Sequence, residues 1–464
     1  MTLSDLSAIV RLLLGRVAKR LYWIASPKRL AAQQAALRDG NAGRYRVERY
    51  ATNGESRAAT DKQWIVCLTH EPPWPIQAGN QYRIARMIGW FLAKGYGLLV
   101  VVAPMAGVPL SDNNRQAVFQ KYENALLCYR RGLIQGSTRT LDLSLDRLDG
   151  QPIAQTLDRA ENSSLHEYEI QNCHDALIGV AQEIARQLPG AIWYINYAFM
   201  SRVIDYLPEN VVTFVDTHDV FSQKPEKVFS YGITGETPIT ADEERRMLLR
   251  PDAALAIQGE DAADLRRLVP EQTILTVGVD FDFVALDPPP RTPTILMVAS
   301  DNPLNTKGLH DFLQFAWPSI KAAVDDVRLI LVGLIGRTAP ADDSQIVATG
   351  AVASLHPYYE RARVVINPAI AGTGLKVKTV ESISHMRPIV TWPAGVDGIG
   401  EPLIKLCYVV RNWREFSDTV TNLLMTTLDS ELSVTDYAAI RAGLSTQAVY
   451  HELETWLGNT NRGK

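Results

Sequence analysis

The chain has 464 residues and a mass of 51.5 kDa, more than one hydrophobic core can organise, so its length predicts two or three domains. Hydrophobic residues make up 46% and charged residues 21%, which is typical of globular enzymes and excludes a disordered, collagen-like or coiled-coil chain. The four cysteines are widely spaced and contain no CxxC pair, so neither a zinc knuckle nor a disulfide scaffold is predicted. They are typical of a reducing compartment.

The formal net charge of −4 is unevenly distributed along the chain. Residues 1–60 contain 11 basic and 4 acidic residues, whereas the remaining 404 contain 36 basic and 47 acidic residues. An acidic body argues against nucleic-acid binding, and a basic leader indicates an anionic partner.

Apolar residues recur at helical spacing between residues 3 and 24, which predicts an amphipathic helix. Basic residues interrupt the apolar positions, so neither a signal peptide nor a transmembrane helix is expected. The helix either lies on an anionic membrane or packs on the protein's own core, and residues 30–60 are predicted to be a spacer. We expect a cytoplasmic protein that is at most peripheral, on the inner face of the cell membrane.

From residue 64 the pattern changes to alternating strands and helices. An apolar run at 64–69, a helical stretch at 82–94 and a second apolar run at 98–102 predict a βαβ unit. A proline-rich segment at 287–293 interrupts this pattern, and the alternation restarts at residue 295. The fold class is therefore α/β, with two doubly wound Rossmann-like domains facing an interdomain cleft. The predicted units are a basic helix and spacer (1–60), an N-terminal domain (61–286) with a weakly periodic insertion of little strand content at 130–171, a linker (287–293), a C-terminal domain (294–430) and C-terminal helices (431–464).

The segment from Asn367 to Glu381 is the most informative stretch for chemistry. A predicted strand ends at Asn367, a loop with Gly372 and Gly374 follows, and a helix begins near residue 375. Free N–H groups at such a helix start attract anions, and Lys378 and Glu381 can share one helix face. A lysine for a diphosphate and a carboxylate for ribose hydroxyls would suit a nucleotide. The alternative is a glycine turn followed by a helix with a surface Lys–Glu pair.

Several segments resemble, in order and spacing, the C-terminal domain of GT-B glycosyltransferases, most of all the group 1 retaining family (family 4), which uses nucleotide sugars. The resemblance covers residues 290–430 well and residues 64–283 more weakly. The segments that carry it in the C-terminal half are MVASDNPLNTKGLHDFL, LILVGLIG, GAVASLHPYYERARVVINP, GTGLKVKTVESISHMRPIV and PAGVDGI.

The resemblance implies a donor-binding role for residues on both sides of the cleft. Glu381 matches the second acidic residue of the E-x7-E signature and would hold the ribose. Lys378 and Lys307 match lysines that face the donor phosphates, and Gly79 matches a glycine that meets the pyrophosphate from the N-terminal side. The first acidic position is Thr373 here, so the backbone N–H groups of residues 372–375 (Gly372, Thr373, Gly374 and Leu375) would contact the sugar instead.

Polar residues follow two predicted strands of the N-terminal half. Asp216 and His218 come after the strand at 211–215, where an imidazole suits a sugar hydroxyl and a carboxylate suits a base in an inverting mechanism. The alternative is a helix N-cap beside a structural histidine, but similarity to the family's histidine loop favours His218 over Asp216. His70 and Glu71, after the first strand, would contact the acceptor or merely cap the loop. Arg83 lies close to Gly79, in the loop that resembles the family, and is expected to bind the acceptor.

These inferences predict a retaining glycosyltransferase that uses a nucleotide-sugar donor and a glycan or lipid-linked acceptor, in bacterial surface polysaccharide or glycolipid synthesis. Lys307, Lys378 and the helix start would neutralise the departing diphosphate, so no cofactor and no metal are expected. The Asp280-Phe281-Asp282 sequence is a DxD motif, but it stands where the family has an exit turn. An inverting GT-B enzyme, a nucleotide-sugar 2-epimerase and a catalytically silent membrane scaffold remain alternatives.

Overall fold

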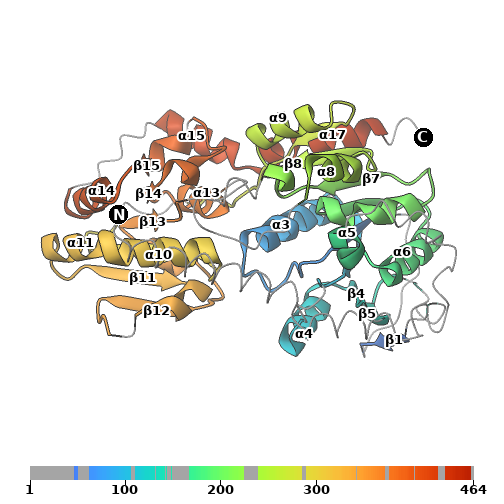
Figure 1. The fold of residues 1–464 in the computed structure, drawn as a ribbon, viewed down its shortest axis with the longest axis horizontal. Helices are drawn as coiled ribbons and strands as arrows, with labels where there is room; N and C mark the ends of the chain where they lie inside the picture. Colours follow the sequence, from blue (N-terminus) through green and yellow to red (C-terminus); the bar gives the residue numbers. More distant parts are fainter. Residues whose placement is uncertain are drawn as a thin grey trace, which may run out of the picture.

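The computed structural model describes most of the two predicted halves. The described residues are 46–50, 62–105, 110–130, 132–141, 143, 148, 167–223, 239–284, 289–340, 342–370, 376–401, 403–426 and 434–460. They form two separate β-sheets, each covered by helices on both faces, and the two halves lie side by side (Figure 1). The predicted helix at 3–24 lies outside the described residues.

The N-terminal half contains a nine-stranded sheet in the order β1-β5-β4-β3-β2-β6-β7-β8-β9. All neighbouring strands are parallel except β4 and β5, which are antiparallel. The central strands are buried along their whole length, which explains their continuous apolar runs. The strands are β1 (Arg46–Arg49), β2 (Trp64–Thr69), β3 (Gly97–Val102), β4 (Asn124–Cys128), β5 (Leu133–Thr138), β6 (Ile192–Asn196), β7 (Thr213–Asp216), β8 (Ala253–Ala256) and β9 (Ile274–Thr276).

Helices cover both faces of this sheet and bury two separate apolar clusters. Ile178 and Ile184 of one helix pack in the first cluster, whereas Ile84 and Phe91 of another pack in the second. The helices are α3 (Gly79–Ala93), α4 (Asp112–Lys121), α5 (Glu167–Asn172), α6 (Asp175–Gln187), α8 (Ala241–Leu248) and α9 (Gly259–Leu268).

The C-terminal half contains a six-stranded, fully parallel sheet in the order β12-β11-β10-β13-β14-β15. Its first strand begins at Thr294, directly after the proline-rich segment, and apolar clusters lie on its two faces. The elements are β10 (Thr294–Val298), α10 (Pro303–Phe315), α11 (Trp317–Ala323), β11 (Arg328–Val332), β12 (Ile346–Gly350), α12 (His356–Arg361), β13 (Val364–Asn367), α13 (Val377–Ser384), β14 (Ile389–Thr391), β15 (Cys407–Val409) and α14 (Trp413–Met425).

The last helices return from the C-terminal half to the N-terminal half. Helix α15 (Val434–Gly443) packs beside α13 through Ile440, whereas α16 (Thr446–Val449) and α17 (His451–Thr460) reach the N-terminal sheet. Leu453 and Leu457 are buried in the same cluster as Phe214 of β7. In Figure 1, α17 therefore lies with the N-terminal half, where it packs against β9.

Two details of the sequence prediction are wrong. Residues 46–49, expected to belong to a spacer, form β1 and pair in parallel with β5. Residues 133–138, expected to belong to an insertion with little strand content, form β5 itself. Both are strands near one edge of the sheet, and their pairing partner rather than their own apolar pattern holds them there.

Among the helices that the structure describes, none combines the length and the apolar character needed to cross a membrane.

Candidate functional site

The polar residues gather where the strand order of each sheet reverses. In the N-terminal sheet the reversal lies between β2 and β6, and in the C-terminal sheet it lies between β10 and β13. Such points leave a crevice at the carboxyl ends of the strands, because the connections run away in opposite directions. His70 follows β2, Tyr197 follows β6, Asn302 and Asn305 follow β10, and α13 follows β13.

The two halves meet at the starts of α3 and α13. Gly79 begins α3, and a Cβ atom at this position would lie 3.2 Å from the Cβ of Val377, the first residue of α13. Tyr82 of α3 and Val380 of α13 join one apolar cluster that spans both halves. Gly79, predicted to meet the pyrophosphate, therefore lies at the junction of the halves, where a larger residue would crowd α13.

Lys378 is held by a neutral partner from α10. Its Nζ donates a hydrogen bond to Oδ1 of Asn305, a residue that is 5% exposed. Asn305 in turn donates its Nδ2–H to the carbonyl oxygen of Ser300 at 3.0 Å, so its Oδ1 is the atom that faces α13. Burial, and then the charge of Lys376, lowers the pKa of Lys378 to about 8.

Glu381 is held by a neutral partner from α12. The hydroxyl of Tyr359 donates to Oε2 of Glu381 at 3.3 Å, and Tyr359 is fully buried. The Tyr359 ring stacks on His385 with ring centres 4.1 Å apart, and Nδ1 of His385 bonds the backbone oxygen of Glu381 at 2.9 Å. Burial raises the pKa of Glu381 to about 7, although the bond from Tyr359 lowers it.

The other predicted donor-binding residues are Lys307 and residues 372–375, and the structure describes only Lys307. Lys307 is 44% exposed along its side chain and pairs with Asp311 at 2.6 Å, one turn further along α10. It therefore lies apart from the Asn305–Lys378 contact in this structure. Residues 372–375, predicted to contact the sugar, lie outside the described residues.

His218 lies at the carboxyl end of β7 with an unusual backbone. Both His218 and Tyr197, at the end of the neighbouring strand β6, have positive φ angles, of 59° and 74°. Left-handed backbone is uncommon for residues other than glycine and clusters at functional sites. The rings of the two residues stack 4.2 Å apart, so β6 and β7 jointly fix the imidazole.

Hydrogen bonds fix the state of the His218 ring. Asn196 donates its Nδ2–H to the carbonyl oxygen of Leu68 at 3.2 Å, which turns its Oδ1 toward Nε2 of His218 at 2.9 Å. Burial lowers the pKa of His218 to about 4, despite the nearby Asp216. The neutral ring thus donates through Nε2 and keeps Nδ1 as a hydrogen-bond acceptor.

His70 and Glu71 lie beside this histidine. The His70 ring packs on Tyr197 at 4.3 Å, and its Nδ1 is buried without a hydrogen-bond partner. Burial lowers the pKa of His70 to about 3. Glu71 is more exposed, with 34% of its side chain accessible, and burial still raises its pKa despite a weak bond from Gln81. The structure therefore brings His70, Glu71 and His218 together at the carboxyl ends of the strands of the N-terminal sheet.

Arg83 and Asp216 lie inside the N-terminal half rather than on the cleft wall. Their exposures are 1% and 0%, and the guanidinium binds the carboxylate at 2.8 and 3.0 Å. Tyr194 donates a further bond at 3.2 Å. Burial alone would raise the pKa of Asp216, but Arg83 and the hydrogen bonds outweigh it and hold that pKa below its usual value. An acceptor contact for Arg83 and a base role for Asp216 are therefore not supported.

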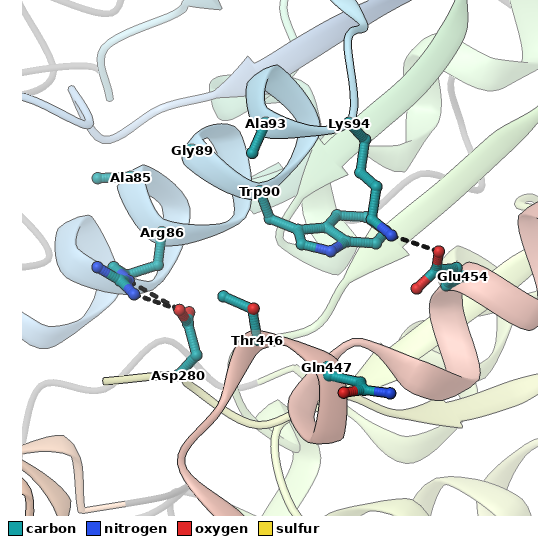
Figure 2. A pocket seen from close by; sticks show the side chains of 10 residues that line it. All are labelled: Ala85, Arg86, Gly89, Trp90, Ala93, Lys94, Asp280, Thr446, Gln447 and Glu454. Atoms are coloured by element: carbon teal, nitrogen blue, oxygen red, sulfur yellow. Dashed lines mark hydrogen bonds and ion pairs between the residues drawn. The ribbon is translucent and has the colours of Figure 1, made fainter. Parts of the chain in front are cut away.

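The DxD motif has a structural partner. Arg86 of α3 binds both Asp280 and Asp282, and the hydroxyl of Tyr450 donates to Asp280 at 2.7 Å. Figure 2 shows Arg86 and Asp280 bonded to each other at one end of a cavity of about 680 Å³ between α3 and the last helices. Lys94 and Glu454 pair at its other end, so its charged residues are compensated. Among the described residues, no group of three or more His, Cys, Asp or Glu is arranged to hold a metal ion.

Asn305, Tyr359, Tyr197 and Asn196 were not predicted from the sequence. Nothing in HPYYER distinguishes Tyr359 from its neighbour Tyr358, because only the pairing of α12 with α13 decides which ring faces Glu381. Asn305 precedes the predicted Lys307 by two positions, which was the one signal that pointed to this turn.

Comparison with known proteins finds a family match in the C-terminal half. Residues 292–426 match the family described as glycosyl transferases group 1. No curated protein sequence matches the chain.

Solved structures with the same fold match most of the chain at low identity. TarM of S. aureus, solved as a mutant in complex with fondaparinux, alpha-GlcNAc-glycerol and UDP, has 11% identity and a TM-score of 0.57, covering 86% of this chain and 100% of its own. Sucrose-phosphate synthase from Thermosynechococcus elongatus has 13% identity and a TM-score of 0.57, covering 87% and 100%. HepE of Anabaena, solved with UDP and glucose, has 11% identity and a TM-score of 0.56, covering 87% and 100%.

Proposed function

We propose that the chain, which has the GT-B fold, is a group 1 glycosyltransferase that transfers a sugar from a nucleoside diphosphate sugar to a glycan or lipid-linked acceptor with retention of configuration. The observation that supports the proposal is the placement of Lys378 and Glu381 in the first turns of α13, the helix whose Val377 and Val380 pack at the junction of the two halves. We place the reaction in the synthesis of a bacterial surface polysaccharide or glycolipid. TarM and HepE, both solved with UDP, support a nucleotide donor.

Lys378 would act on the diphosphate that leaves the donor sugar. Its ammonium is partly desolvated, so it would interact more strongly with developing phosphate charge than a surface lysine does. Glu381 would accept hydrogen bonds from ribose hydroxyls. His218 would accept a bond from a sugar hydroxyl at Nδ1, because its Nε2 is already engaged by Asn196.

Retention is favoured because Asp216, the predicted base of an inverting mechanism, is buried. An inverting transferase needs a carboxylate or similar base on the acceptor, and Asp216 is buried in an ion pair with Arg83. Glu71 is the remaining carboxylate beside His70 and His218 that combines exposure with a raised pKa. Inversion through Glu71 is therefore the second candidate, and the neutral variant Glu71→Gln separates the two.

The first test is nucleotide binding by the purified chain. UDP, GDP, CDP and ADP are screened by thermal unfolding, where a ligand at about 100 times its dissociation constant stabilises by about 2.7 kcal/mol. We expect one nucleotide to stabilise the wild type and not Lys378→Ala, and we expect Lys378→Ala to lower turnover by about 10²–10³-fold. Asp311→Ala, on the same domain but away from the Asn305–Lys378 contact, is the control. Wild-type turnover in Lys378→Ala would contradict the assignment.

The second test reads the product. With the donor that binds, NMR of the product anomer distinguishes retention from inversion. Full activity of Glu71→Gln with a retained anomer supports the proposal, whereas an inverted anomer and loss of activity in Glu71→Gln support the second candidate. Epimerised donor in the absence of acceptor would favour the epimerase, and tight donor binding without turnover on any acceptor would favour a scaffold.

A further inference from the structure

Lys378 and Glu381 carry opposite charges three residues apart on α13, yet they do not bind each other. Residues at this spacing on a helix are neighbours and commonly form ion pairs. Among the described residues, however, no ion pair joins them: Lys378 donates to Asn305 and Glu381 accepts from Tyr359. A pair that closed on itself would cancel the two charges that a nucleotide needs.

We propose that Asn305 and Tyr359 are positioning residues that hold Lys378 and Glu381 apart, so that both charges face a nucleoside diphosphate before it binds. This inference rests on the proposed function, because it assigns the nucleotide to the start of α13. It adds two residues from α10 and α12 that do not themselves contact the ligand.

The Asn305 side chain is suited to this role because hydrogen bonds to Ser300 fix the orientation of its amide. Ser300 accepts from its Nδ2 through both the backbone oxygen, at 3.0 Å, and Oγ, at 3.3 Å. Asn302 caps the helix and accepts from the Asn305 backbone N–H at 2.9 Å. The amide can therefore present only Oδ1 to Lys378, and a neutral oxygen directs the ammonium without neutralising it.

Tyr359 is fixed just as firmly on the other side. Its ring is fully buried and stacks on His385, and its backbone oxygen accepts from Arg387 at 2.8 Å. Among the described residues, the Tyr359 hydroxyl bonds only Oε2 of Glu381. A single donated bond leaves the other carboxylate oxygen for ligand hydroxyls.

The pH dependence of binding reports on the Tyr359 contact. The groups near Glu381 are Lys378 and His385 on and just after α13, Lys376 before it, His356 and Tyr359 on α12, and Tyr82 on α3. The ionised carboxylate accepts ribose hydroxyls, so affinity falls as the pH drops below the pKa of Glu381, which is about 7. Removing the Tyr359 hydroxyl removes a bond that favours the ionised form, so this fall moves to higher pH.

The experiment measures calorimetric affinities for UDP and uridine from pH 6 to 9, in wild type, Tyr359→Phe and Asn305→Ala. We expect Tyr359→Phe to weaken UDP binding about tenfold at pH 7 and to move its acid limb up by about one pH unit. We expect Asn305→Ala to weaken UDP about tenfold but uridine much less, since only UDP carries the phosphates. If Asn305→Ala does not fold, Asn305→Ser replaces it, because serine is too short to reach Lys378.

Matched controls are the adjacent residues, Tyr358→Phe and Thr306→Ala, neither of which contacts Glu381 or Lys378 in the structure. If wild type binds UDP and both test variants bind as their controls do, with unchanged pH profiles, this inference fails while the proposed function stands. If UDP does not bind, the series is repeated with whichever of GDP, CDP or ADP binds. If wild type binds none of the four, both fail.

Discussion

Arg83 and Asp216 bring a fully buried ion pair to the end of β7, two residues before His218. The pair joins α3 to the strand that carries the histidine, so its role is to position the edge of the sheet rather than to contact substrate. Desolvating two charges is costly, and the pair repays this cost only while both partners and their hydrogen bonds are present. Removing one partner leaves an uncompensated charge in the core.

We expect Arg83→Met to lower the free energy of unfolding by about 3–5 kcal/mol at pH 7, measured by urea denaturation. Because the pKa of Asp216 is held below its usual value in the folded state, this contribution is present at neutral pH and is lost as the pH falls through that folded-state pKa. The exposed pair Arg414–Asp418 gives the control, and Arg414→Ala should cost less than about 1 kcal/mol. Equal small losses in both variants would contradict a buried, structural Arg83.

The histidines at the site show what sequence predicts at this scale. The position of His218 after a strand predicted a residue at the carboxyl edge of the sheet, and in the structure His218 follows β7 and stacks on Tyr197. The charge state of His218 was not predictable. The burial that lowers its pKa involves Asn196, the last residue of β6, and Tyr197, which follows it. The roles predicted for Arg83 and Asp216 failed for the same reason: only the fold shows that they face each other.

At the scale of elements, α10 lies unusually close to the end of β13. Gly308 in this helix has no room for a side chain, since a Cβ atom would lie 2.7 Å from the backbone oxygen of Pro368. The contact involves backbone, which cannot move aside as a flexible side chain can. This close approach brings Asn305, in the first turn of α10, within reach of Lys378 on α13.

We expect Gly308→Ala to destabilise the chain by about 1–3 kcal/mol, because it forces α10 away from the segment after β13. The same displacement would separate Asn305 from Lys378 and weaken binding of the nucleotide identified by the thermal screen. Gly89→Ala in α3 is the control, since no atom lies within 4 Å of the added methyl group, and it should stabilise by about 0.5–1 kcal/mol. Unchanged stability in Gly308→Ala would show that the helix shifts without cost.

The elements that sequence predicted well are those whose own pattern determines them. Buried central strands such as β2 and β3 are continuous apolar runs, and the proline-rich segment marks where β10 begins. By contrast, β1 has the sequence RVER and β5 has LIQGST, which carry little apolar signal. Their strand form depends on each other across the sheet, which a local pattern does not contain.

On the scale of the whole molecule, the end of the chain completes the N-terminal half. Helix α17 packs against β9, and Glu452 accepts a hydrogen bond from the backbone N–H of Thr276 at 2.7 Å. Trp456 meets Phe214 edge-on at 6.1 Å, and Tyr450 stacks on Trp90 at 4.8 Å. The N-terminal core is therefore closed by residues that the sequence places beyond the C-terminal half, which the predicted boundaries treated as a separate unit.

This closure predicts that damage at the chain's end is felt in its first half. Leu453 is fully buried against the N-terminal sheet, so Leu453→Ala should cost about 2–5 kcal/mol. Amide hydrogen exchange should accelerate in β8 and β9, whereas β10 and β11 of the C-terminal sheet should exchange as in wild type. Thr455→Ala on the exposed face of the same helix should change stability by no more than about 0.5 kcal/mol. Faster exchange in β10 and β11 but not in β9 would contradict this assignment and would mean that α17 supports the C-terminal half instead.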